Sequence, residues 1–366
     1  MKINFIDLKA QYNTYKDEID SEIAKVLESS QYIGGAKLDE FENNLKNYVG
    51  SNHAIGCSSG TDALLLALMA IDLQPNDEVI TTPFTFIATA EVIALLGAKP
   101  VFVDIEKESY NIDPTQIEAA ITPKTKAIIP VSLYGQVANM DEINAIAAKH
   151  DLTVIEDGCQ SFGATYKGKK SCNLSHIGCT SFFPSKPLGA YGDGGAIFCS
   201  DDALAQKMRI LLNHGQNERY NHKYVGINGR LDTIQAAILD VKLKHFSQEV
   251  TKREQIALRY IDGLKDIEGI TLPKIREDRS SVFAQFTIVC EDRDAIQQKL
   301  TDAQIPTAIH YPKPLHLQEV FASLNYSKGD FAVSEEIAQK VISLPMSPFL
   351  SEKDQDYIIQ TLKATQ

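Results

Sequence analysis

Short apolar runs rich in β-branched residues alternate with segments of helical periodicity between about residues 54 and 200. Each run is five or six residues long, which is typical of a buried strand. Strands separated by helices predict a mostly parallel sheet with helices on both faces. The predicted strands are Asp77–Thr81, Lys99–Asp104, Ala127–Val131 and Leu152–Asp157, and the predicted helices are Ala63–Ala70, Thr85–Leu96 and Met140–Lys149.

The pattern changes at Asp232–Lys244, which begins a long helix. The rest of the chain is mainly helical in pattern and has only a few predicted strands, of which Val282–Cys290 is the clearest. We therefore predict a large α/β domain over residues 1–240 and a smaller α+β domain over residues 241–366. No low-complexity linker separates them, so we expect the two parts to pack tightly. In mostly parallel sheets, ligands bind at the carboxyl ends of the strands.

The composition indicates which partner to expect. The chain has 366 residues, of which 44% are apolar and 23% charged, and its formal net charge is -12. This acidity opposes long-range attraction to nucleic acid or to an anionic membrane, so the expected partner is a small molecule. The amino terminus shows no signal peptide, and no segment is long and apolar enough to span a bilayer.

The cysteines indicate a reducing compartment and do not form a recognisable metal-binding pattern. Six cysteines are scattered without a CxxC pair, and in a chain of this size they are expected to be reduced thiols. Cys172, His176 and Cys179 are close in sequence, but their spacing fits no standard zinc pattern. We therefore expect a cytoplasmic protein without a metal site.

Lys186 is the strongest candidate for chemistry, within the segment SFFPSKPLGAYGDGGAIF. Pro184 and Pro187 stiffen the backbone on both sides of this lysine, and four glycines in the segment allow other groups to approach closely. A lysine that is crowded by apolar groups loses affinity for its proton and can form a Schiff base with a carbonyl. Pyridoxal 5'-phosphate (PLP) is a cofactor that requires such a lysine.

Ser58–Asp62 directly precedes the predicted helix Ala63–Ala70 and is a candidate phosphate site. Gly60 allows close approach of the backbone. Thr61 and Asp62 lie where the free amides of a helix amino terminus would hold a phosphate. The alternative is an ordinary capped helix without a ligand, because serine and threonine are common capping residues.

Asp157 closes a predicted strand, and a carboxylate in this position can pair with the ring nitrogen of the cofactor and keep the ring an electron sink. Gln160 lies just beyond it and could donate to the ring oxygen. Phe86 follows another predicted strand and could stack on the ring. The alternatives are a turn or capping residue for Asp157 and a simple core residue for Phe86.

These segments together resemble the DegT/DnrJ/EryC1/StrS family of sugar-nucleotide aminotransferases from one end of the chain to the other. The motifs are SSGTDALLLAL, PFTFIATAE, IEDGCQSFGATYKGKK and TSFFPSKPLGAYGDGGAIF. The resemblance implies the aspartate aminotransferase-like fold type I of PLP-dependent enzymes, in a homodimer. It implies that Lys186 binds the cofactor covalently and moves protons, that Asp157 holds the ring nitrogen, that Gln160 contacts the ring oxygen and that Phe86 stacks on the ring.

The resemblance also implies a phosphate cup formed mainly by Thr61, Asp62 and Ser181. Asn228 would reach the phosphate of the neighbouring subunit, so the active site would need the dimer. Similar sugar dehydratases carry histidine at the position of Lys186, whereas this chain keeps the lysine. The resemblance therefore implies a transaminase that takes its amino group from L-glutamate and passes it to a keto-sugar.

The segment IPTAIHYPKPL, together with CNLSHIGCTSFFPSKPLG, HGQNERY and GRLDTIQAAIL, is similar to aminotransferases that act on UDP-2-acetamido-2-deoxy-3-oxo-D-glucuronate in bacterial O-antigen or capsule synthesis. By that likeness, Arg230, His310 and Tyr311 would contact the sugar nucleotide. A guanidinium group matches the geometry of a carboxylate, such as that of the uronate. The alternatives are that Arg230 only supports the loop of Asn228 and that His310 is a packing residue.

Two other functions stay open. A transaminase for a dTDP- or UDP-linked keto-deoxy-sugar, giving a 3- or 4-amino product, would share the cofactor site but would need no carboxylate contact. A non-catalytic regulator that senses PLP or a sugar nucleotide would not need a complete electron sink. The presence of Lys186, Asp157 and Gln160 argues against the regulator.

Overall fold

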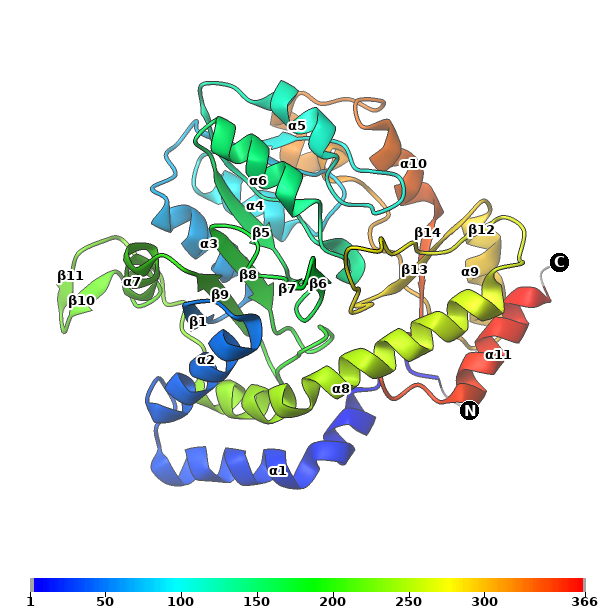
Figure 1. The fold of residues 1–366 in the computed structure, drawn as a ribbon, viewed down its shortest axis with the longest axis horizontal. Helices are drawn as coiled ribbons and strands as arrows, with labels where there is room; N and C mark the ends of the chain where they lie inside the picture. The colour runs from blue at the N-terminus through cyan, green and yellow to red at the C-terminus, as the bar shows by residue number, and fades with distance from the viewer. Residues whose placement is uncertain (1–2, 365–366) are drawn as a thin grey trace.

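A seven-stranded sheet forms the centre of the protein in the computed structural model, which describes residues 3–364 (Figure 1). Its strand order is β1-β9-β8-β5-β4-β2-β3, and all pairs are parallel except those of β9 with β1 and β8. The predicted mostly parallel sheet is therefore confirmed. The strands are β1 (His53–Cys57), β2 (Glu78–Thr81), β3 (Lys99–Phe102), β4 (Thr125–Ile128), β5 (Thr153–Asp157), β8 (Ile177–Ser181) and β9 (Gly195–Cys199).

The four predicted strands are present as β2, β3, β4 and β5, and they differ from the prediction only at their ends. β4 ends at Ile128 instead of Val131 because Pro130 has no N–H group with which to extend the hydrogen-bonded ladder. β1, β8 and β9 are additional strands that were not predicted. They complete the half of the sheet that lies beyond β5.

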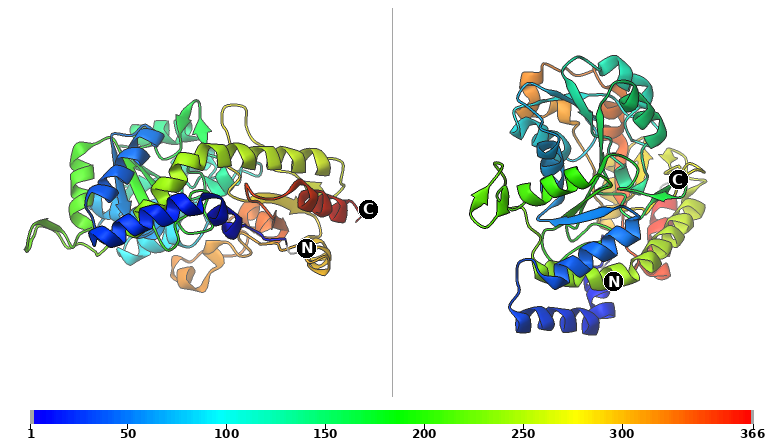
Figure 2. Two further views of the ribbon diagram at one scale, coloured as in Figure 1. Left: turned by 90° about the horizontal axis from the view of Figure 1, so that it is seen from below. Right: turned by 60° about the vertical axis from the view of Figure 1, so that its left-hand side comes forward.

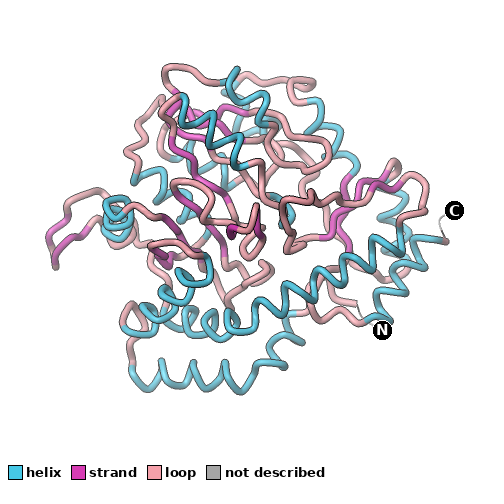
Figure 3. The backbone as a smooth tube through the Cα atoms, in the orientation of Figure 1, coloured by secondary structure: helices cyan, strands magenta, loops and turns pink. Residues whose placement is uncertain are grey.

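Helices cover both faces of the sheet, with the strands between them (Figure 3). α4 begins at Ala88, not at the predicted Thr85, because the Thr82 hydroxyl accepts a hydrogen bond from the Phe84 N–H (3.2 Å) and holds the chain in a turn. The helices of one face are α3 (Gly60–Ala70), α4 (Ala88–Leu95) and α7 (Asp202–Leu211), and those of the other are α2 (Ala36–Val49), α5 (Pro114–Ala120), α6 (Met140–Lys149) and part of α8 (Thr233–Leu264).

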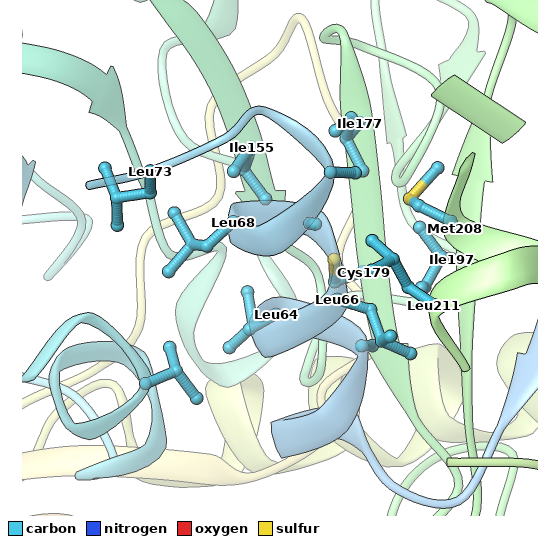
Figure 4. Close-up of a cluster of buried hydrophobic side chains, with 14 of the residues drawn as sticks. Leu64, Leu66, Leu68, Leu73, Ile155, Ile177, Cys179, Ile197, Met208 and Leu211 are labelled. Carbon is cyan, nitrogen blue, oxygen red and sulfur yellow. The ribbon is translucent and has the colours of Figure 1, made fainter. Parts of the chain in front are cut away.

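The helix α3 is apolar on nearly all sides, which is typical of a helix enclosed by protein. Figure 4 shows Leu64, Leu66 and Leu68 of this helix packed against side chains of β5, β8 and β9. Met208 and Leu211 of α7 close the same cluster. This packing fixes the amino terminus of α3 against the carboxyl ends of the strands.

The C-terminal part has its own apolar core around a small antiparallel sheet. α8 runs from the large sheet to this part, and α1 lies beside it (Figures 1 and 2). The predicted boundary near residue 240 falls inside this continuous helix and stays a prediction. The remaining larger elements are α1 (Leu8–Ser29), β12 (Ile270–Thr271), β13 (Phe286–Cys290), α9 (Arg293–Asp302), α10 (Ala332–Lys340), β14 (Val341–Leu344) and α11 (Glu352–Lys363).

Two short hairpins lie outside these sheets. One consists of β6 (Thr165–Tyr166) and β7 (Lys169–Lys170); the other, of β10 (Gln216–Glu218) and β11 (Asn221–His222), projects away from the body in Figures 1 and 2. Within residues 3–364, no helix has the length and apolar character needed to cross a membrane.

Candidate active site

A cavity of about 420 Å³ lies where the carboxyl ends of β5 and β8 meet segments of the C-terminal part. Nine of the residues predicted for the site line it. They are Gly60, Thr61, Phe86, Asp157, Gln160, Ser181, Lys186, His310 and Tyr311. The cavity therefore gathers residues that lie up to about 250 positions apart in the sequence, at the edge of the sheet where α/β proteins bind ligands.

Lys186 lies in the tight loop that follows β8. Its N–H donates to the Phe183 carbonyl (2.8 Å), and three residues later the Gly189 carbonyl accepts from the Lys242 ammonium (2.5 Å). The structure shows no acidic partner for the Lys186 side chain within residues 3–364. The amine thus faces the cavity without an ion pair.

Asp157 lies at the last position of β5, and its carboxylate is buried. One oxygen, Oδ2, accepts from the Thr89 hydroxyl (2.8 Å), and Oδ1 accepts from the Cys159 N–H (3.2 Å). Thr89 also bonds the Thr85 hydroxyl (3.1 Å). Because a carboxylate has about four acceptor sites, these two donors orient it and leave capacity for a further donor in the cavity.

Gln160 is held by both ends of its amide. Oε1 accepts from the Tyr134 N–H (2.9 Å), and Nε2 donates to the Tyr311 hydroxyl (3.2 Å). Burial, and to a lesser extent the negative charge of Asp157, raise the pKa of Tyr311, so its phenol stays neutral. The remaining N–H of Gln160 can donate to a ligand, as the prediction requires.

The amino terminus of α3 lies at another part of the cavity. The Ser59 hydroxyl caps this helix by accepting from the Asp62 N–H (3.0 Å), which leaves the N–H groups of Gly60 and Thr61 without intrahelical acceptors. A side chain at Gly60 would not fit, because its Cβ would lie 2.6 Å from Cβ of Ser181. The carboxylate of Asp62 accepts from the Ser58 hydroxyl and does not line the cavity.

Phe86 and His310 border the cavity as well. The Phe86 side chain is 53% exposed, and its ring centroid lies 6.1 Å from that of Tyr311. His310 Nδ1 lies 3.2 Å from the Ser343 hydroxyl. Burial, followed by the positive charge of Lys186, lowers the pKa of His310, so its ring is neutral around pH 7.

Arg230 and Asn228 do not reach the cavity of this single subunit. Arg230 Nη1 donates to Asn213 Oδ1 (2.5 Å), while its Nε is buried and has no partner in the described part of the chain. Asn228 is exposed, and its backbone forms an isolated antiparallel β-bridge with that of Asn213. Their predicted roles thus depend on contacts that one subunit does not make.

Several residues around the cavity were not predicted. Thr89 and Thr85 have a weak sequence signal, because they lie four residues apart in a segment of helical pattern and so can face the same side. Tyr134 and Gln285 have no signal in the sequence. Cys159 also lines the cavity, but burial and the charge of Asp157 raise the pKa of its thiol, which keeps it protonated.

Residues 13–363 match the model of the DegT/DnrJ/EryC1/StrS aminotransferase family. The chain belongs to this family. The resemblance stated from the motifs is therefore confirmed, and the protein is an aminotransferase that uses PLP.

Two curated relatives are similar along nearly the whole chain. The UDP-2-acetamido-2-deoxy-3-oxo-D-glucuronate aminotransferase of Pseudomonas aeruginosa is 54% identical over 348 residues, which cover 95% of this chain and 96% of that protein. A "Pleiotropic regulatory protein" of Geobacillus stearothermophilus is 47% identical over 99% of this chain and 98% of its own length.

Two solved structures have closely similar folds. DesV of S. venezuelae has a TM-score of 0.98 at 38% identity and covers 100% of this chain and 98% of its own. The ntda protein of Bacillus subtilis, with bound PMP, has a TM-score of 0.91 at 35% identity, with coverages of 96% and 82%. These similarities confirm the predicted PLP-dependent transferase fold.

The cavity fits this cofactor. The open N–H groups at the start of α3 suit a phosphate, and the missing side chain of Gly60 allows Ser181 to lie close beside them. The oriented carboxylate of Asp157 suits a protonated ring nitrogen, and the amine of Lys186 is not occupied by an ion pair.

Proposed function

We propose that this enzyme transfers the amino group of L-glutamate to UDP-2-acetamido-2-deoxy-3-oxo-D-glucuronate and forms the corresponding 3-amino sugar. The observation that carries this proposal is the 54% identity over 95% of the chain with the P. aeruginosa enzyme of that name. The product would enter bacterial O-antigen or surface polysaccharide synthesis in the cytoplasm. The six cysteines, none of which forms a disulfide, are consistent with a reducing compartment.

In this proposal PLP supplies an electron sink beside the amine that is transferred. Lys186 acts on the protons at the reacting carbon, since its amine lacks an ion-pair partner and sits in a loop held at both ends. Asp157, oriented by Thr89, holds the ring nitrogen in its protonated form. Gln160 donates to the ring oxygen with its free N–H, and Phe86 covers one face of the ring.

The phosphate is held by the N–H groups of Gly60 and Thr61 and by the Ser181 hydroxyl. We propose that the enzyme works as a homodimer in which Asn228 of each subunit completes the phosphate site of the other. The exposure of Asn228, outside its own cavity, supports this arrangement. Asp62 would contribute through its position in the first turn of α3, because its carboxylate is engaged by Ser58.

His310 and Tyr311 line the cavity and are proposed to contact the sugar nucleotide. Arg230 is proposed to bind the uronate carboxylate across the dimer with N–H groups at the end of its guanidinium, because its Nε is buried within its own subunit. Replacing Arg230 by methionine should then slow amination of the uronate much more than that of a neutral keto-sugar. Equal loss with both sugars would favour a role in supporting the loop.

The first test is the visible absorption of the protein with PLP, before and after addition of L-glutamate. Wild type should show the absorption of PLP bound to a lysine, and glutamate should convert it to that of pyridoxamine phosphate. Lys186→Ala should lose this absorption, whereas Lys353→Ala, on the exposed side of α11, should keep it. A wild-type spectrum that glutamate leaves unchanged would contradict transamination from glutamate and favour the sensor, a function suggested by the regulatory name of one relative.

A further inference from the structure

Tyr134 has a backbone conformation that is unusual for its residue type. It is the middle residue of η1 (Leu133–Gly135), a short turn that follows β4, and its φ of 55° lies in the left-handed region. Bulky residues rarely adopt this conformation, whereas glycine does so without steric cost. Such strained residues persist where surrounding contacts hold them, and they concentrate at functional sites. A tyrosine at this position therefore calls for a contact that glycine could not make.

The side chain of Tyr134 supplies such a contact. Its hydroxyl donates a hydrogen bond to the main-chain carbonyl of His310, in the C-terminal part. Within residues 3–364, no other hydrogen-bond donor reaches this carbonyl. Burial raises the pKa of Tyr134 well above its ordinary value, so the phenol keeps the proton that it donates. The hydroxyl thus ties the main chain at His310 to the large domain.

The main-chain N–H of Tyr134 holds a second group of the site. It donates to Gln160 Oε1 at 2.9 Å, and because an N–H group can only donate, this contact fixes which end of the Gln160 amide is the oxygen. The other end, Nε2, donates to the Tyr311 hydroxyl at 3.2 Å. Tyr311 directly follows His310 in the chain. These three hydrogen bonds therefore form a closed circuit that begins and ends at Tyr134.

Two contacts fix Tyr134 itself. The N–H of the preceding residue, Leu133, donates to Oδ1 of the buried Asn111 at 2.8 Å. The ring of Tyr134 packs edge-to-face against that of Tyr110, with 5.6 Å between the ring centroids. Because the turn and the ring are both held, the hydroxyl and the N–H of Tyr134 are oriented before a ligand binds, which lowers the entropic cost of ordering the site.

The circuit joins two parts of the cavity wall that have different proposed ligands. Gln160 is proposed to contact the cofactor, whereas His310 and Tyr311 are proposed to contact the sugar nucleotide, and all three line the cavity. Tyr134 is bonded to both parts but does not line the cavity. It can therefore act on a ligand only through the residues that it holds.

We propose that Tyr134 is a positioning residue for the acceptor sugar, and that its hydroxyl holds the His310–Tyr311 segment where the sugar nucleotide requires it. This inference rests on the proposed function, because it needs a sugar as the amino acceptor. In that function glutamate is acted on by Lys186 and by the cofactor that Asp157 holds, and the His310–Tyr311 segment contacts only the sugar nucleotide. Loss of the hydroxyl should therefore impair the reaction with the sugar far more than the reaction with glutamate.

The test compares the two half-reactions of PLP-loaded wild type and Tyr134→Phe, each followed in single turnover by the change in cofactor absorption. Phenylalanine keeps the aromatic ring and the main-chain N–H that bonds Gln160, and it removes only the hydroxyl. With glutamate, the variant should react within about twofold of wild type. With UDP-2-acetamido-2-deoxy-3-oxo-D-glucuronate, kcat/KM should fall about 5- to 50-fold, the range expected when a carbonyl loses its hydrogen bond.

Tyr110→Phe is the matched control. Tyr110 belongs to the same buried cluster as Tyr134 and also has a positive φ, of 62°. Its hydroxyl has no hydrogen-bond partner in the described part of the chain. Both substitutions remove one hydroxyl group from this cluster, but only Tyr134→Phe should separate the two half-reactions. All rates are measured well below the Tm of each protein, so that a loss of stability alone changes neither half-reaction.

Three outcomes would count against the inference. Equal losses with glutamate and with the sugar would show that the Tyr134 hydroxyl only supports the fold. A wild type that aminates the sugar, with an unaffected Tyr134→Phe or an equally affected Tyr110→Phe, would overturn this inference alone. If wild type reacts with glutamate but aminates no keto-sugar, the proposed function fails and this inference fails with it.

Discussion

Lys242 is a buried cation whose effect on stability should depend on pH. It lies on α8 with its side chain 2% exposed. Its ammonium donates to the Gly189 carbonyl at 2.5 Å and lies 4.3 Å from the ring centroid of Tyr191. Burial lowers the pKa of Lys242 from 10.5 to about 8, and the negative charge of Glu249 opposes this decrease.

The direction of the pH effect on stability follows from the pKa of Lys242 in the folded and in the unfolded chain. In the unfolded chain its pKa is the ordinary 10.5, so below pH about 8 both states are protonated and the folded state bears the full cost of burying the charge. The difference between the two pKa values corresponds to about 3 kcal/mol. As pH rises from 8 towards 10.5, only the unfolded chain keeps the proton, and the free energy of unfolding rises. Between pH 7 and pH 9.5 this gain amounts to about 2 kcal/mol.

Urea denaturation of wild type and Lys242→Met at these two pH values measures the effect. The buried tyrosine and cysteine side chains also titrate at high pH, but they are common to both proteins and cancel in the difference. We expect the free energy of unfolding of wild type to rise by about 2 kcal/mol relative to the variant between pH 7 and pH 9.5. Lys244→Met, an exposed lysine on the same helix, should show no such change. A difference between wild type and Lys242→Met that is independent of pH would refute the reasoning.

Two predictions concern the groups beside the cofactor. Gly60→Ala should lower the free energy of unfolding by about 1–3 kcal/mol and weaken PLP binding, because the added Cβ would lie 2.6 Å from that of Ser181. Gly192→Ala should leave the free energy of unfolding and the affinity for PLP nearly unchanged, since its Cβ would approach only the end of a flexible glutamine side chain at 3.1 Å. Equal effects of Gly60→Ala and Gly192→Ala would contradict the steric argument. Thr89→Val removes a donor to Asp157 and should lower the free energy of unfolding of the PLP-free protein by about 1.5–3 kcal/mol in urea; an unchanged value would show that this hydrogen bond does not hold the carboxylate.

The hydrophobic pattern predicted the parallel half of the sheet and the helices between its strands, because strands buried on both faces are continuous apolar runs. It did not predict β1, β8 or β9: Gly56 and Gly178 interrupt the apolar runs of β1 and β8, and β9 begins directly at Gly195. The start of α4 was wrong by three residues, since the hydroxyl of Thr82 that holds the preceding turn acts through a contact that periodicity does not record.

The site could be predicted where the sequence carries a local constraint. Lys186 lies between prolines and glycines, and Asp157 ends an apolar run, so their neighbours in the chain mark them out. Thr89 bonds Asp157 from 68 residues away, and Gln160 bonds Tyr311 from 151 residues away. Such hydrogen bonds depend on how the helices and strands pack in space. The pattern of apolar residues does not specify which polar side chains that packing brings together.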